Sequence, residues 1–230
     1  MMRWLHQRFA RIRGDEAGLS MTELLVAAML TSVMLVMVGT MFIQTLRLTT
    51  AATQTRNSNG VASSMSNGIT SVLRTATTRA VSGTEIPEPA IVSGTRNSLT
   101  IYAYSDTIAA TPAPVKVTYW IDSAGVLWEK RCAGTASGGF WTYGGCGTGV
   151  DRRLGDGLQN SASDTLFGYR SGDGNIIVIG NNPLSDAQRA TVGSITVTVK
   201  VKAPGSTNDA VVIASTVVLR NLGLDTGAEE

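Results

Sequence analysis

The apolar positions of this chain follow two different patterns, and the first is an unbroken run near the N-terminus. Residues 24–46 are 23 consecutive positions without a charge, and Leu, Val, Met and Ala dominate them. A helix of that length spans roughly 34 Å, against about 30 Å for the hydrocarbon core of a bilayer. The run therefore predicts a helix that can cross a membrane.

Beyond Arg47 the chain becomes polar but keeps a helical spacing of apolar residues. The stripe comprises Val61, Met65, Ile69, Val72, Leu73, Ala76 and Ala80. It predicts the second half of a long helix, which packs on a sheet and ends near residues 82–83. Gly60, Gly68 and the polar residues 57–59 predict a weak or interrupted middle, because glycine lowers helix stability.

The second pattern, an alternation of apolar and polar residues, begins after the two prolines Pro87 and Pro89. Such alternation is typical of half-buried strands. The predicted strands cover residues 97–104, 115–122, 125–131, 166–170, 176–179, 194–202 and 210–220. We expect an α+β fold in which one long helix, residues 19–83, packs against an antiparallel β-rich domain, residues 84–222, followed by a flexible acidic tail, residues 223–230.

The segment before the apolar run is basic. Residues 1–18 hold four arginines, so the positive-inside rule leaves the N-terminus in the cytoplasm and the later domain outside. An ordinary secretory signal is a poor description, since the run is too long and lacks a small-residue cleavage site. A plain single-pass anchor leaves Glu23 unexplained, because an ionised carboxylate at the mouth of an apolar run is costly without a partner.

The string Ala17-Gly18-Leu19-Ser20-Met21-Thr22-Glu23-Leu24-Leu25 resembles the signature of type IV prepilins. The resemblance implies that a prepilin peptidase cleaves after Gly18 and N-methylates the new terminus at Leu19. It also implies that Glu23 serves filament assembly by pairing with a charged terminal amine, which would fix the axial register. Residues 1–18 would then be a cleaved leader.

This resemblance implies a structural subunit, similar to the larger PilW-like minor pilins or J-type pseudopilins, of a type IV pilus or related filament. Its partners would be other pilin subunits, the prepilin peptidase, a membrane assembly platform and, before assembly, membrane lipid. It would sit in the cytoplasmic membrane with its C-terminal domain outside, and later in a surface filament. The alternative from another class is a membrane-anchored extracellular binding or adhesion module that does not polymerise.

Two cysteines, Cys132 and Cys146, are predicted to form a disulfide that closes a 15-residue loop in the exported part of the chain. Three aromatic residues stand among glycines inside that loop: Phe140, Trp141 and Tyr143. Two interpretations are open. The rings fold back over the sheet edge and add to the core, or they form a contact surface for a subunit, a receptor or a glycan.

Charge and histidine content argue against several other functions. The net charge is +2, and residues 19–230 hold 15 basic and 15 acidic groups, so direct nucleic-acid binding is not expected. The one histidine, His6, lies in the predicted leader, which excludes histidine-based catalysis and zinc sites in the cleaved protein. We expect no enzyme activity, no cofactor and no metal.

Overall fold

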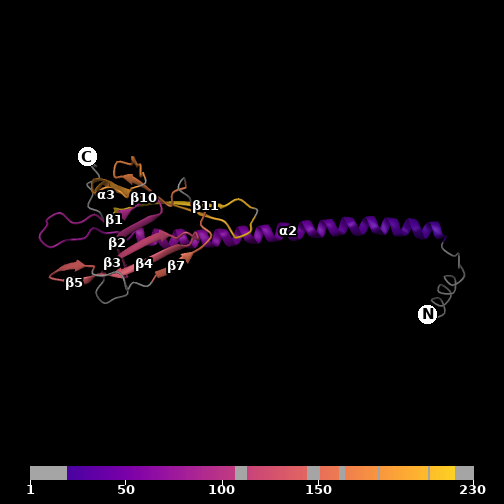
Figure 1. Ribbon diagram of the computed structural model, residues 1–230, viewed down its shortest axis with the longest axis horizontal. Helices are drawn as coiled ribbons and strands as arrows, with labels where there is room; N and C mark the ends of the chain where they lie inside the picture. The colour runs from indigo at the N-terminus through magenta and orange to yellow at the C-terminus, as the bar shows by residue number, and fades with distance from the viewer. Residues whose placement is uncertain are drawn as a thin grey trace, which may run out of the picture. The chain divides into compact units, whose positions relative to one another are not determined.

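The computed structural model describes residues 20–106, 113–143, 151–160, 164–180, 182–206 and 208–220. The chain divides into two compact units, residues 1–50 and residues 51–230. One helix, α2 (Met21–Leu73), provides all of the described structure of the first unit and enters the second. Antiparallel sheets dominate the rest of the second unit, which confirms the predicted α+β class (Figure 1).

The second unit contains two main sheets, and every described strand pair is antiparallel. The first sheet has the order β1-β2-β3-β4-β7 and comprises β1 (Ile91–Gly94), β2 (Ser98–Asp106), β3 (Ala113–Ile121), β4 (Leu127–Ala133) and β7 (Asp151–Gly155). The second has the order β11-β10-β8-β9 and comprises β8 (Phe167–Ser171), β9 (Ile176–Ile177), β10 (Val192–Val201) and β11 (Val211–Val218). A separate hairpin joins β5 (Thr135–Ser137) to β6 (Phe140–Thr142), and a short helix, α3 (Asp186–Thr191), precedes β10.

Both sheets turn their apolar faces toward the last turns of α2 and share one core with it. On the helix, Ala62, Met65, Ile69 and Leu73 have no exposed surface. The sheets contribute alternate residues of their strands, as period-two patterning requires: Leu99, Ile101, Val117, Tyr119, Leu127, Phe167, Tyr169, Ile195, Val197 and Val199. The Tyr119 and Phe167 rings lie 6.5 Å apart between centroids, so the two sheets also touch each other.

The helix differs from its prediction in two respects. It runs without interruption through Gly39, Gly60 and Gly68, so an interrupted middle was wrong. Its end is also earlier than residues 82–83, at Leu73. After that residue the chain pairs with β2: Thr77 N–H donates to the Tyr102 carbonyl, and Tyr104 N–H donates to the Thr75 carbonyl.

These pairings explain the early end, because strand hydrogen bonds replace the helical ones and β-branched threonines favour extended backbone. Ala80, predicted to lie on the buried stripe, is exposed for the same reason. Strands β2, β3, β4, β8, β9, β10 and β11 coincide with predicted ones within a few residues, whereas β1, β5, β6, β7 and α3 were not predicted.

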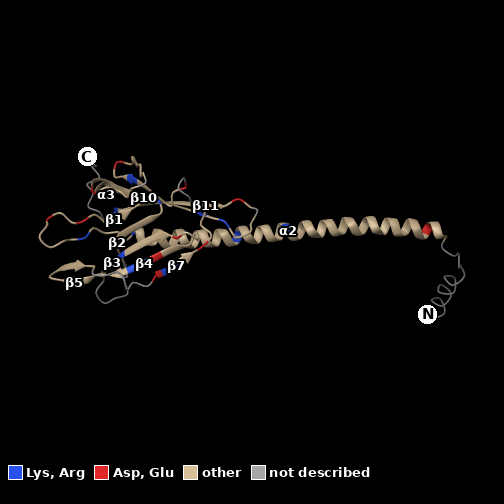
Figure 2. Cartoon of the chain, in the orientation of Figure 1, with Lys and Arg blue, Asp and Glu red and all other residues tan. Residues whose placement is uncertain are grey.

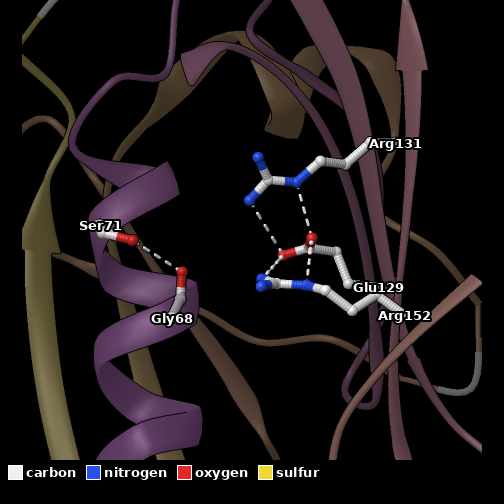
Figure 3. A network of polar contacts seen from close by, with 5 residues as sticks. All are labelled: Gly68, Ser71, Glu129, Arg131 and Arg152. Atoms are coloured by element: carbon white, nitrogen blue, oxygen red, sulfur yellow. Dashed lines mark hydrogen bonds and ion pairs between the residues drawn. The ribbon is translucent and has the colours of Figure 1, made fainter. Parts of the chain in front are cut away.

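A buried carboxylate lies on the inner face of the first sheet (Figure 3). Glu129 on β4 has no exposed side-chain surface, and two arginines bind it from either side. Arg131 Nε lies 2.6 Å from Oε1, and Arg152 donates from Nε and Nη2 at 3.1 Å each. Burial alone would raise the pKa of Glu129, but the hydrogen bonds from the two guanidinium groups outweigh it and hold the pKa below its ordinary value.

We expect Glu129→Gln to lower the free energy of unfolding at pH 7 by about 1–3 kcal/mol, because it removes a charge that two arginines neutralise. Since the folded-state pKa is depressed, Glu129 contributes stability above its unfolded pKa of about 4.3, and that contribution is lost as pH falls through the folded value. Denaturant unfolding of the full chain in detergent, followed by tryptophan fluorescence between pH 2 and 7, measures the free energy of unfolding at pH 7 and its dependence on pH. Equal acid sensitivity of wild type and Glu129→Gln would contradict this account.

Candidate functional site

The start of α2 is a capping box built from Ser20 and Glu23. Glu23 N–H donates to Ser20 Oγ at 3.2 Å, and Ser20 N–H donates in return to Glu23 Oε2 at 3.0 Å. Two main-chain donors that a helix start leaves unpaired are thereby satisfied, and the acidic side chain lies at the positive end of the helix dipole. Glu23 therefore has a local structural role that the sequence analysis missed, although the Ser-x-x-Glu spacing is its sequence signal.

The following residues of α2 present apolar side chains on every side. Over residues 24–46, all side chains are exposed in the isolated chain, and the long tan stretch of α2 in Figure 2 carries no charge. Hydroxyl groups within the run bond back to the helix: Thr31 donates to the Ala27 carbonyl and Ser32 to the Ala28 carbonyl, both at 2.7 Å. With these hydroxyl groups bonded to its own carbonyls, this helix is long and apolar enough to cross a membrane.

The predicted cleavage residues Gly18 and Leu19 lie outside the described residues, and so does Cys146. Cys132 on β4 is disulfide-bonded. Among the described residues, no three His, Cys, Asp or Glu side chains come together as ligands of a metal would.

The aromatic residues of the predicted contact loop lie on and beside the β5–β6 hairpin. Gly138 and Gly139 form its turn with φ of 58° and 83°, values that suit glycine and the two-residue hairpin turn. Phe140 and Trp141 on β6 are half-buried, whereas the tip residues are exposed.

Tyr143, immediately after β6, anchors this hairpin on the first sheet. Its ring stacks on Tyr102 of β2 with 5.0 Å between centroids, and its hydroxyl donates to the Pro114 carbonyl at 3.0 Å. Burial raises the pKa of the Tyr143 phenol, and the neighbouring Tyr102 contributes in the same direction. Tyr143 therefore fits the interpretation in which the rings fold over the sheet.

Arg79 ties these rings to the hairpin. Its guanidinium carbon lies 5.2 Å from the Tyr102 centroid and 5.8 Å from that of Tyr143, and Nη1 donates to the Trp141 carbonyl at 3.3 Å. Glu88 Oε2 forms an ion pair with Arg79 Nη2 at 2.7 Å. Neither Arg79 nor Tyr102 was singled out from the sequence, because the contact joins segments more than 20 residues apart and leaves no local spacing signal.

Comparison with known proteins adds no assignment. A scan against models of protein families finds no match, and a search of curated proteins finds no significantly similar chain. The described geometry thus comprises a capped apolar helix that can span a membrane and a β domain with an anchored aromatic hairpin.

We expect Arg79→Ala to loosen the β5–β6 hairpin, since the change removes two cation–π contacts and the bond to the Trp141 carbonyl. Chymotrypsin cleavage at Phe140 and Trp141, followed on reducing gels, should accelerate about tenfold, because loop opening sets the rate of cutting. Arg79→Lys keeps the charge but loses the planar guanidinium, so its cleavage rate should lie between those of wild type and Arg79→Ala. Unchanged cleavage in Arg79→Ala would contradict an anchoring role.

Proposed function

We propose that this chain is a structural subunit, of the minor pilin or pseudopilin kind, of a type IV pilus or related filament. In this proposal a prepilin peptidase cleaves it after Gly18, and its apolar helix serves first as a membrane anchor and then as filament core. The observation that carries the proposal is one continuous helix, uncharged and predominantly apolar over residues 24–46 and packed into a β domain over its second half. A hydrophobic helix that stays attached to its domain after processing suits both roles.

The Glu23 carboxylate supports the assembly step. The capping box holds it at the first turn of α2 and uses one of its oxygens. A carboxylate has acceptor capacity beyond one bond, so the other oxygen can accept from a terminal amine of its own chain or of a neighbour. In surroundings of low dielectric, such a pairing favours one register over another.

The alternative is a single-pass anchored module that keeps its N-terminus and never polymerises. Its supporting observation is the half-exposed aromatic hairpin, which a binding module would use to contact a receptor. The two proposals differ at the N-terminus. Mass spectrometry of the protein from its native host should find methylated Leu19 as the first residue; residues 1–18 still attached would contradict the filament proposal.

Three variants separate the charge of Glu23 from its capping role. Glu23→Gln keeps the capping box but removes the charge, Glu23→Ala removes both, and Ser20→Ala weakens the cap while leaving the charge. We expect all three variants to be cleaved. Both Glu23 variants should enter filaments at least tenfold less than wild type, because the charged terminal amine would then have no carboxylate partner in an apolar interface. Ser20→Ala should assemble nearly normally; wild-type incorporation of Glu23→Gln would count against the pairing.

A further inference from the structure

The open edge of β11 differs from the other described sheet edges. Strand β7 carries three charged residues in five, β9 has two residues, and β1 has four with an irregular register. Charge, shortness and irregularity are the usual protections of an edge against pairing with another chain. Strand β11 is eight residues long, has no charge from Val211 to Leu219, and is mostly β-branched. It therefore lacks each of these protections.

The main-chain groups on that edge are available. Within the described residues, β11 pairs with β10 alone. Leu219 N–H donates to the Gly193 carbonyl, so odd-numbered residues direct their polar groups to β10. Val212, Ala214, Thr216 and Val218 consequently direct their N–H and C=O groups to the open edge. Val212 and Val218 are 57% and 61% exposed.

The edge ends at a pocket with two cationic side chains. Arg74, just after α2, and Arg220, just after β11, line it together with Thr216, Val217 and Val218, and none of the described residues that line it is acidic. Guanidinium groups are the preferred partners of carboxylates in proteins. A strand that pairs with β11 would thus meet a binding site for an acidic group at one end.

The direction of β11 decides which partner fits. Asn208, before β11, donates to the Ala51 carbonyl, Ser215 Oγ lies 3.1 Å from Ser66 Oγ, and Val218 shares the pocket with Arg74. The strand therefore runs in the same direction as α2 in this unit. Twofold pairing of β11 with β11 of a second copy would be antiparallel, so the two chains would enter their domains from opposite ends. Two chains anchored in one membrane cannot do this.

We propose that the open edge of β11 takes an extended strand of a different filament subunit, with Arg74 and Arg220 binding a carboxylate at the end of that strand. The strand would be uncharged and rich in β-branched residues, so that main-chain hydrogen bonds supply the affinity and the arginine pair sets the register. That the partner is a filament subunit rests on the proposed function.

The test is photo-cross-linking of the full chain in its native host, with p-benzoylphenylalanine in place of Val212. Mass spectrometry should identify an adduct on an uncharged segment of another filament subunit, and an Asp, a Glu or a C-terminal carboxylate should lie several residues from the adduct, at the end of the segment that reaches Arg74 and Arg220. Ala214→Pro removes an outward donor but no bond to β10, and should lower the yield at least tenfold. Ala214→Ser keeps the donor and is the matched control.

Arg220→Glu leaves the ladder intact and should lower the yield about tenfold, whereas Arg220→Lys should lower it less. If thermal unfolding shows that Ala214→Pro is misfolded, the comparison of Arg220→Glu with Arg220→Lys replaces it as the test. An adduct only on lipid or on a second copy of this chain, or an undiminished yield in Arg220→Glu, would overturn the inference. Cleavage after Gly18 is measured in the same sample. If the protein is cleaved and present in filaments but forms no adduct, this inference is overturned while the proposed function is not.

Discussion

The β domain depends on the burial of one stripe of α2. Met65 lies directly against the backbone of β7, where a Cβ on Gly155 would collide with its side chain. Ser66 meets Ser215 of β11, so the same two turns of helix contact an edge strand of each main sheet. Each fully buried Leu, Ile or Met side chain contributes about 1.5–3 kcal/mol. Because both sheets contact this stripe, they form one core with the helix, and loss of the helix would expose the inner apolar faces of both sheets.

The first part of α2 differs from the buried stripe, because its apolar side chains are exposed. Large side chains such as Met29, Leu35 and Phe42 are more than 60% exposed, and no element of the described chain covers them. Exposed apolar surface on this scale is unfavourable in water. Lipid or the apolar faces of other helices can cover it without change to the helix, since its hydroxyl groups already bond to its own carbonyls. The same residues can therefore serve in a membrane and in a packed bundle.

The sequence predicted those features that repeat at short range. The strand β10 alternates Ile195, Val197 and Val199 with polar residues, as predicted for residues 194–202. Between the predicted strands at 115–122 and 125–131, Gly125 adopts a φ of 72° in the turn that joins β3 to β4. Strand β7 was not predicted, because one of its two arginines, Arg152, binds a partner 23 residues away in sequence, Glu129, and this contact leaves no local signal. The helix end was placed too late for a similar reason: Ala76 pairs with Ala103, and the competing strand bond has no local signature.

Capping and assembly make compatible demands on Glu23. A free glutamate side chain at a membrane surface would have to lose rotamer freedom before it could hold a terminal amine, at a cost of up to about 2 kcal/mol. The bond from Ser20 N–H already orders the carboxylate in the isolated chain. Cleavage after Gly18, as proposed, would leave Ser20 as the second residue, so the cap would survive and the new amine would lie one residue before it. In the proposed filament, the capping box would thus prepare the carboxylate for a second partner, so a serine three residues before the glutamate would suit assembly in register.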